Sequence, residues 1–229
     1  MQTAIHKETI DFLKALAKNN NREWFNNHKT RYTNANNNMI AFADALLAEM
    51  NKHDKIETPS GKDSLFRIYR DVRFSADKTP YQIYFSGGFK RATQRLRGGY
   101  YFHIEPGNSY VGGGFWGPNT DDLKRIRQDI DYNYPDWEKL LSDKSLIKTF
   151  GGLQGEQLSS APRGYAKDHP AINLLRYKQF ILKHTFAGDE ICSPAFAKSA
   201  NEVFKKMRPF FDFMSDLLTT DANGVPGFD

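Results

Sequence analysis

The chain has 229 residues, of which 39% are hydrophobic and 14% aromatic, with a net charge of +5 and a single cysteine, Cys192. This composition supplies enough apolar surface to bury a core and excludes an intrinsically disordered protein. One cysteine cannot form an internal disulfide, and no apolar run reaches the roughly 20 residues of a membrane helix. We therefore expect a cytoplasmic protein without a membrane partner.

The first quarter of the chain, residues 1–55, has apolar side chains at three- and four-residue steps, the spacing of helices that bury one face. A short helix is expected around Ile10–Ala17, followed by asparagines whose side chains can accept free N–H groups at a helix start. A longer helix is expected from about Arg22 to Lys52, with a bend at Asn36–Asn38, because asparagine is a poor helix former. The N-terminal region is thus predicted to be helical.

From Leu65 to Trp116 the pattern changes to aromatic-rich runs punctuated by Gly, Pro and Asn, which is typical of strands. The expected strands are Leu65–Phe74, Ile83–Lys90, Gly99–Glu105 and Ser109–Phe115. Such short connections predict an antiparallel sheet, because parallel strands need long crossovers.

Helical patterns return in the second half of the chain. Thr120 is expected to cap one helix and Pro135 to open another, while Ser193-Pro194 opens a C-terminal helix, because proline fits the first helical turn. Between them, Lys178–Phe186 is expected to form one more strand.

No linker or internal repeat divides the sequence, so residues 1–229 are predicted to form a single α+β domain. An antiparallel sheet would pack against N-terminal and C-terminal helices. The regions in chain order would be helical at 1–55, mainly strands at 62–117, helices with a loop and a strand at 118–190, and a C-terminal helix at 193–219.

Positive charge is concentrated between Lys62 and Arg97. This segment has nine basic and three acidic residues, a net charge of +6, whereas the rest of the chain sums to −1. A concentrated positive field attracts anions and raises their local concentration.

Within this segment, the run Leu65–Arg73 would give an extended chain two different faces. One face would carry two arginines beside an acid and an aromatic side chain, namely Arg67, Tyr69, Asp71 and Arg73. Planar guanidinium groups in such a fork suit the oxygens of a phosphate or a carboxylate. The motif therefore predicts contact with an anionic ligand.

Arg70 would point to the opposite, apolar face, where an unpaired charge is costly, and Asp77 is its candidate partner. Lys78 and Tyr81 follow as a further cation and a further aromatic hydroxyl. The alternative is that Asp71 and Asp77 neutralise the arginines in an internal ion-pair network, since such networks resemble ligand sites. Two acids cannot neutralise three arginines and a lysine, so both interpretations stay open.

A second cluster, Arg163, Tyr165 and His169, lies in a stretch rich in Gly, Ser and Pro. A loop with these side chains could close over a ligand. The alternative is an ordinary surface loop in which Tyr165 packs against the protein.

A third group, His103 and Glu105, would share one face of a strand with Tyr101. It could supply a general acid and a base, or two metal ligands. A metal needs three or four ligands, and no His or Cys pattern completes a set, so we expect none. Glycines at 112–117 match the spacing of a dinucleotide fingerprint but lack its strand–helix–strand unit, so we expect no cofactor.

Three stretches of the chain resemble the family called domain of unknown function 2461, which comprises mostly bacterial proteins of about this length. They are Asn-Asn-Arg22-Glu-Trp24-Phe25, the motif from Phe66 to Tyr81, and Pro162-Arg-Gly-Tyr-x-x-x-His-Pro170 with Leu174, Leu175 and Lys178. The resemblance covers nearly the whole chain and implies a single cytoplasmic domain, but it implies no activity and no catalytic residues. Gln82 departs from the family pattern, where a lysine is expected, and this weakens an anion-contact role for that position.

The leading hypothesis is a binding site for a phosphorylated or other anionic small molecule. Its candidate ligand-binding residues are Arg67, Tyr69, Arg70, Asp71, Arg73, Asp77, Lys78, Tyr81, Arg163, Tyr165 and His169. Whether the protein is an enzyme stays open. For an enzyme, the proton-transfer candidates are His169, His103 and Glu105, because histidine titrates near neutrality.

Two alternatives belong to other classes of protein. A single-stranded nucleic-acid-binding module would use aromatic and basic side chains together, and the basic surface would extend over Lys90, Arg91, Arg95 and Arg97. A structural or partner-binding domain would have all its arginines paired internally. The sequence leaves the oligomeric state open.

Overall fold

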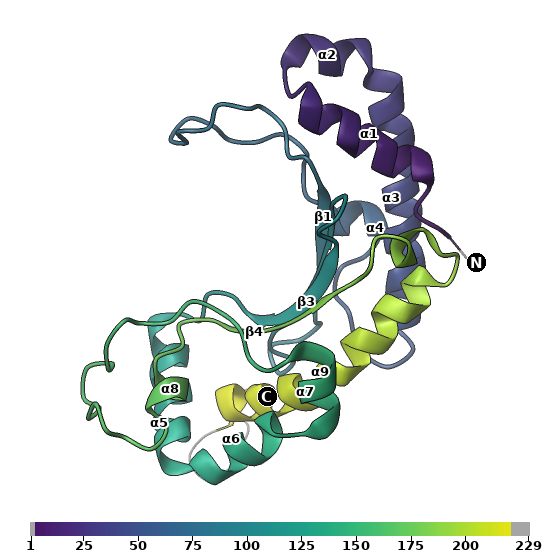
Figure 1. Ribbon diagram of the computed structural model, residues 1–229. Helices are drawn as coiled ribbons and strands as arrows, with labels where there is room; N and C mark the ends of the chain where they lie inside the picture. The colour runs from purple at the N-terminus through teal and green to yellow at the C-terminus, as the bar shows by residue number, and fades with distance from the viewer. Residues whose placement is uncertain (1–2, 221–229) are drawn as a thin grey trace. The chain divides into compact units, whose positions relative to one another are not determined.

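The computed structural model describes residues 3–220, and its fold belongs to the α+β class (Figure 1). Four strands form an antiparallel sheet whose spatial order follows the chain, β1-β2-β3-β4. They are β1 (Phe85–Lys90), β2 (Gly99–Ile104), β3 (Tyr110–Phe115) and β4 (Phe180–Thr185). The predicted class and the antiparallel sheet are confirmed.

Helices precede and follow the strands in chain order, as predicted. They are α1 (Lys7–Lys18), α2 (Arg22–Asn27), α3 (Lys29–Met50), α4 (Gly61–Ser64), α5 (Thr120–Tyr132), α6 (Tyr134–Leu141), α7 (Lys144–Phe150), α8 (Ile172–Leu175) and α9 (Phe196–Thr219), with a 3₁₀ turn at Glu190–Cys192. Within residues 3–220, no helix is both long enough and apolar enough to cross a membrane.

The described chain forms two compact units. Unit 1 consists of residues 3–90, 101–111 and 185–202, and unit 2 consists of residues 91–100, 112–184 and 203–220. The candidate ligand-binding residues are divided between them. Those from Arg67 to Tyr81 belong to unit 1, whereas Arg163, Tyr165 and His169 belong to unit 2.

The predicted helix from Arg22 to Lys52 is in fact two helices, because the chain of unit 1 leaves helical geometry at His28. His28 has φ −114° and ψ 24°, and its ring nitrogen Nδ1 hydrogen-bonds the carbonyl oxygen of Trp24 at 2.8 Å. Helix α3 then runs without interruption through the asparagines where a bend was expected. One of them, Asn38, is buried and its side chain bonds the backbone of the segment before α1.

In unit 1, one face of the sheet packs into the core. Phe102 of β2 meets Phe42 of α3 edge-on, with 5.6 Å between ring centroids. Gly87 of β1 permits this close packing, because a Cβ at that position would lie 2.5 Å from the Phe102 ring. Since side chains alternate along a strand, Tyr101 and His103 point to the opposite face.

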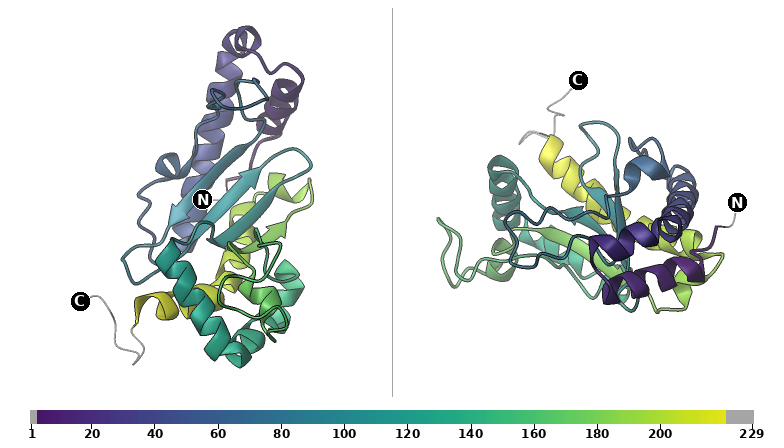
Figure 2. Two further views of the ribbon diagram at one scale, coloured as in Figure 1. Left: turned by 90° about the vertical axis from the view of Figure 1, so that its left-hand side faces the viewer. Right: turned by 90° about the horizontal axis from the view of Figure 1, so that it is seen from above.

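The predicted strand Leu65–Phe74 is not formed, and residues 65–84 belong to no strand of the sheet. Among described residues, its ladder contacts are two isolated bridges, Leu65 with Gly87 and Tyr69 with Tyr81. Phe66 bonds Ser86 and Gln82 bonds Ile68, so the return side has extra residues and the ladder breaks. We call residues 65–84 the arm; it is the loop between α4 and β1 in Figure 1, and it lies beside α2 and the start of α3 in Figure 2.

Glycines at 112–114 of unit 2 have a steric explanation. A Cβ on Gly113 would lie 2.6 Å from the sulfur of Met207 in α9, and one on Gly114 would lie 2.1 Å from the carbonyl oxygen of Phe180. Gly114 also has a φ of +147°, a conformation that favours glycine. The spacing that resembles a dinucleotide fingerprint therefore serves the packing of β3 against α9 and β4.

The helices of the second half begin close to their predicted positions. Helix α5 is capped by Asn119 rather than by Thr120, because the Asn119 side chain accepts the backbone N–H of Asp122 at 2.8 Å. Pro135 lies in the first turn of α6, and α9 begins at Phe196, just after Ser193-Pro194.

Candidate functional site

Two adjacent asparagines fasten the arm to the N-terminal helices of unit 1. Asn21 caps α2 by accepting the backbone N–H of Trp24 at 2.9 Å. Asn20 bonds the backbone of Tyr81 twice, donating to its carbonyl oxygen at 2.9 Å and accepting its N–H at 3.1 Å. The Tyr81 ring, only 4% exposed, stacks on Phe25 at 4.0 Å. Tyr81 therefore anchors the arm instead of presenting its ring to solvent.

Lys29, the first residue of α3, joins this contact as a cation that the sequence reasoning missed. Its Nζ donates to the hydroxyl of Tyr69 at 3.0 Å and lies 4.9 Å from the Tyr32 ring centroid. The hydrogen bond with Tyr69 raises the pKa of Lys29. Forty residues separate the two partners, so no local pattern in the sequence could have paired them.

Arg70 and Asp77 form the ion pair that the sequence predicts. The guanidinium Nη1 of Arg70 lies 2.5 Å from Asp77 Oδ2, and it also donates to the hydroxyl and the carbonyl oxygen of Thr79. Hydrogen bonds from the Thr79 backbone and then from Arg70 lower the pKa of Asp77 to about 2. This network closes the far end of the arm.

Arg73 and Asp71 form a second, bidentate pair near the tip of the arm. Arg73 Nη2 lies 2.6 Å from Asp71 Oδ2, and Nε lies 2.9 Å from Oδ1. Both side chains are exposed, so the pair is a surface one that water screens. The neighbouring Phe74 is 97% exposed, with the Arg73 guanidinium 5.9 Å from its ring centroid.

Arg67 and Lys78 carry positive charge that these two ion pairs do not neutralise. Lys78 Nζ donates to the carbonyl oxygen of Val72 at 3.0 Å, and the Arg67 side chain is exposed. Within residues 3–220, no carboxylate lies within ion-pair distance of either cation. The internal ion-pair interpretation thus accounts for two of the four cations between Arg67 and Lys78.

A hydrogen-bonded cluster of Tyr, His and Glu side chains lies at the base of the arm, on the face of the sheet turned away from α3. The hydroxyl of Tyr101 is 3.2 Å from His103 Nδ1, and His103 Nε2 is 3.0 Å from Glu105 Oε2. The arm reaches this cluster through Tyr84, whose ring packs on His103 at 4.1 Å, and through Phe66, whose ring stacks on Tyr101 at 6.3 Å. The side chains predicted to share one strand face are therefore brought together, and their acid–base role stays a prediction.

Burial is the main influence on the pKa values of the other tyrosine hydroxyls in this cluster. It raises the pKa of Tyr84 and that of Tyr110. The charge of Tyr101 and a hydrogen bond with it raise the pKa of Tyr110 further. Tyr84 and Tyr110 therefore stay protonated at neutral pH and can act as hydrogen-bond donors.

In unit 2, His169 holds its loop to α5. Its Nε2 lies 2.9 Å from Asp131 Oδ1, and its Nδ1 accepts the backbone N–H of Ala171 at 3.0 Å. Both ring nitrogens are thus engaged in the fold of the loop. Tyr165 meets the His169 ring edge-on at 6.0 Å, and burial raises the pKa of its hydroxyl. Arg163 is exposed. That this loop closes over the ligand of the arm stays a prediction.

Several basic residues that would extend a nucleic-acid surface have other roles. The Arg91 side chain is fully buried in unit 2 and bonds Asp212 at 2.9 Å, so it is inaccessible to a polynucleotide. Arg97 pairs with Asp122, and Lys90 pairs with an acid in the segment before α4. The prediction of an exposed Arg91 is wrong. The sequence could not show its burial, because no local pattern distinguishes a buried arginine from an exposed one.

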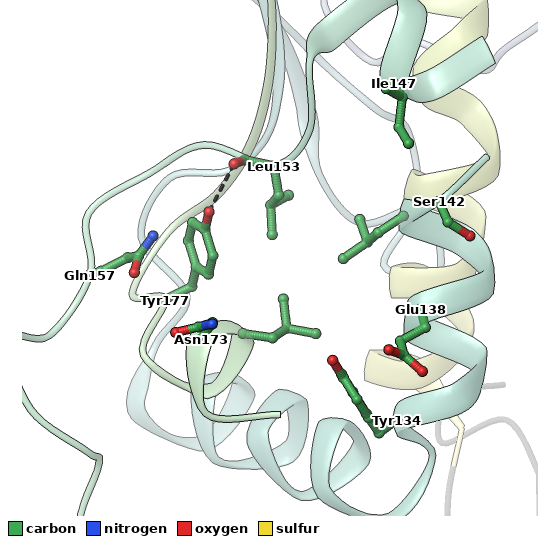
Figure 3. Close-up of a pocket in the computed structure, with 10 residues that line it drawn as sticks. Tyr134, Glu138, Ser142, Ile147, Leu153, Gln157, Asn173 and Tyr177 are labelled. Atoms are coloured by element: carbon green, nitrogen blue, oxygen red, sulfur yellow. Dashed lines mark hydrogen bonds between the residues drawn. The ribbon is translucent and has the colours of Figure 1, made fainter. Parts of the chain in front are cut away.

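Unit 2 also contains an open cavity of about 820 Å³ that the sequence reasoning missed (Figure 3). Its wall combines apolar side chains with a few polar ones: Tyr134, Glu138, Leu141, Ser142, Ile147, Leu153, Gln157, Asn173, Leu174 and Tyr177. The Tyr177 hydroxyl is already bonded to the carbonyl oxygen of Leu153 at 2.8 Å. Because α6, α7, α8 and the loop between α7 and α8 all contribute, no single stretch of sequence signals it.

The site residues contain no evident metal centre. Among residues 3–220, no three His, Cys, Asp or Glu side chains gather in a way that could hold an ion. In unit 1, the chemistry available is that of exposed cations on the arm and of the Tyr–His–Glu cluster at its base.

Comparison with other proteins agrees with the motifs. No curated protein and no solved structure matches the chain. The model of a family described as conserved hypothetical protein (DUF2461) matches residues 8–213. This match covers most of the 229 residues, so the chain belongs to the DUF2461 family.

Proposed function

We propose that the protein binds a phosphorylated or other anionic small molecule on the arm of unit 1. The observation that carries the proposal is that Arg67 and Lys78 are exposed cations with no carboxylate partner in residues 3–220. Charge-assisted hydrogen bonds from such groups to phosphate oxygens are among the strongest that proteins make.

The paired residues of the arm support this role by fixing its shape. Asp77 and Asp71 hold the two arginines nearest the tip, and Asn20 holds the return side at Tyr81. The arm is therefore ordered before a ligand arrives, and less conformational entropy is lost on binding. Tyr69, half exposed and bonded to Lys29, offers a hydroxyl beside a third cation.

The experiment titrates the full chain with pyrophosphate and measures binding by calorimetry and by thermal shift. The variant Arg67→Ala/Lys78→Ala should bind about tenfold more weakly, since each exposed contact contributes about 0.7 kcal/mol. The matched control is Lys62→Ala/Lys198→Ala, which removes the same charge from exposed positions of the same unit and should bind like wild type. Equal affinity of both variants and wild type would reject the proposal.

Single-stranded nucleic acid is the second candidate, because aromatic side chains on the arm are exposed alongside the cations. Phe66 is 58% and Tyr69 50% exposed, and bases stack on such rings. In the same titration, an oligothymidine that binds more tightly than pyrophosphate, with affinity falling steeply as salt is added, would favour this candidate. The buried Arg91 restricts the available basic surface and counts against it.

A further inference from the structure

The cluster at the base of the arm has the arrangement of an activated nucleophile. We propose that Tyr101 is the nucleophile of a phosphoryl-transfer site in which His103 is the general base and Glu105 orients His103. The substrate class, a phosphate ester, rests on the proposed anion-binding function of the arm. The nucleophile itself rests only on the geometry of the cluster.

The hydrogen bonds define which groups of the cluster donate a proton and which accept one. Glu105 accepts a hydrogen bond from Asn108 Nδ2 at 2.7 Å and lies 3.0 Å from His103 Nε2. A carboxylate only accepts hydrogen bonds, so Nε2 carries the imidazole proton and Nδ1 carries the lone pair. That lone pair faces the Tyr101 hydroxyl at 3.2 Å. A nucleophile, a base and a group that orients the base are the signature of covalent catalysis.

Two aromatic rings hold the base in this orientation. His103 is 5% exposed and lies between the rings of Tyr84, at 4.1 Å, and Tyr110, at 4.7 Å and 15°. Rotation of the imidazole away from Tyr101 would break both ring contacts. Tyr110 is hydrogen-bonded to Tyr101 and keeps its own proton, so it can stabilise negative charge on the Tyr101 oxygen.

The arm brings the proposed ligand to this hydroxyl. Tyr101 is half-buried, and Phe66, which stacks on its ring, is the second residue of the arm and immediately precedes Arg67. Arg70 acts electrostatically on Tyr84, the other arm residue in the cluster. Because Arg67 follows Phe66 in the chain, a phosphate bound at Arg67 would be held at the end of the arm nearest the nucleophile.

The reaction would proceed in two balanced steps. In the first, Tyr101 Oη bonds to phosphorus and gives its proton to His103 Nδ1, while the bond from phosphorus to the leaving oxygen breaks and that oxygen takes the proton from His103. In the second, a water molecule gives a proton to His103 and attacks phosphorus. The bond to Tyr101 breaks, and the tyrosine oxygen recovers its proton from His103. The products are an alcohol and phosphate.

The test uses benzenesulfonyl fluoride, a small neutral reagent that needs no anion site. Tyrosine oxygen bonds to sulfur, fluoride leaves, and the tyrosine proton passes to His103. Peptide mass spectrometry compares Tyr101 with Tyr132, which is 80% exposed and serves as an internal reference. Tyr101 should be labelled at least about tenfold faster than Tyr132, and His103→Ala should slow it by about a hundredfold. Added imidazole should restore the rate, which a merely structural histidine would not allow.

Labelling of Tyr101 no faster than that of Tyr132 overturns the inference, and so does a folded His103→Ala protein that labels at the wild-type rate. If His103→Ala does not fold, Glu105→Gln replaces it: slower labelling supports the inference, and an unchanged rate overturns it. Pyrophosphate should protect Tyr101 in wild type but not in Arg67→Ala/Lys78→Ala. Fast labelling without protection overturns the phosphate-ester assignment alone, so failure of the arm and failure of the nucleophile are distinguishable.

Discussion

At Asp77, acid should loosen the arm. Hydrogen bonds from the Thr79 backbone and from Arg70 lower the pKa of this carboxyl to about 2, whereas an unfolded aspartate titrates at about 3.9. A depressed pKa means that the contribution to stability is fully present above about pH 4 and is lost as the pH falls through about 2. Wild type should therefore be more stable than Asp77→Asn at pH 5, and the difference between their urea midpoints should shrink by pH 2. A difference that stays constant over this range would contradict the assignment.

Asn20 should stabilise the protein through its two bonds to the Tyr81 backbone. Asn20→Ala removes both, and each hydrogen bond contributes about 0.5–1.5 kcal/mol, so the free energy of unfolding should fall by about 1–3 kcal/mol. Urea denaturation measures the change. Asn26→Ala, at an exposed position of α2, should be neutral. A loss no larger for Asn20 than for Asn26 would show that the arm is fastened elsewhere.

At the scale of residues, the sequence predicted partners that are close along the chain and missed distant ones. The pairing of Arg70 with Asp77 followed from the need to neutralise a cation among apolar neighbours, and it is confirmed. The approach of His103 to Glu105 followed from strand alternation. The contact of Lys29 with Tyr69 and the burial of Arg91 depend on tertiary packing, so neither had a local signal.

Among the elements, β1 depends on a glycine. A Cβ at Gly87 would lie 2.5 Å from the Phe102 ring and 2.7 Å from the carbonyl oxygen of Ser64, so Gly87→Ala should cost about 1–3 kcal/mol of unfolding free energy. The control is Gly188→Ala in the same unit, where a Cβ meets nothing within 4 Å and the change should stay within about 0.5 kcal/mol. Thermal or urea denaturation of both variants gives the comparison. Equal stability would mean that the ring of Phe102 can move aside.

Strands with clear punctuation were predictable, and the arm was not. The turn at Pro106-Gly107-Asn108 marks the connection of β2 and β3, and both strands lie where expected. The arm has the same aromatic alternation, but extra residues on its return side interrupt the ladder, and only the pairing reveals them. The break at His28 likewise has no Gly or Pro signal, and α4 and α8, with four residues each, are too short for a periodic pattern.

On the scale of the whole molecule, the sequence predicted the α+β class and the family but not the two units. Each unit is assembled from three stretches of the chain, so no linker separates them in sequence. That the chain behaves as one domain stays a prediction. The basic segment from Lys62 to Arg97 continues from unit 1 into unit 2. In unit 2, ion pairs with Asp212 and Asp122 neutralise Arg91 and Arg97, so these two arginines add little to the positive field expected of the segment.

Because the tip of the arm is exposed, the arm can be lengthened at this point. Phe74 is almost fully exposed, while the return side is held at Tyr81 and the start is held at Leu65. Extra residues between Phe74 and Ser75 would lengthen a loop whose two ends are already fixed, which costs little entropy and disturbs no buried contact. The position is therefore suited to insertion of a short tag or a fluorescent label.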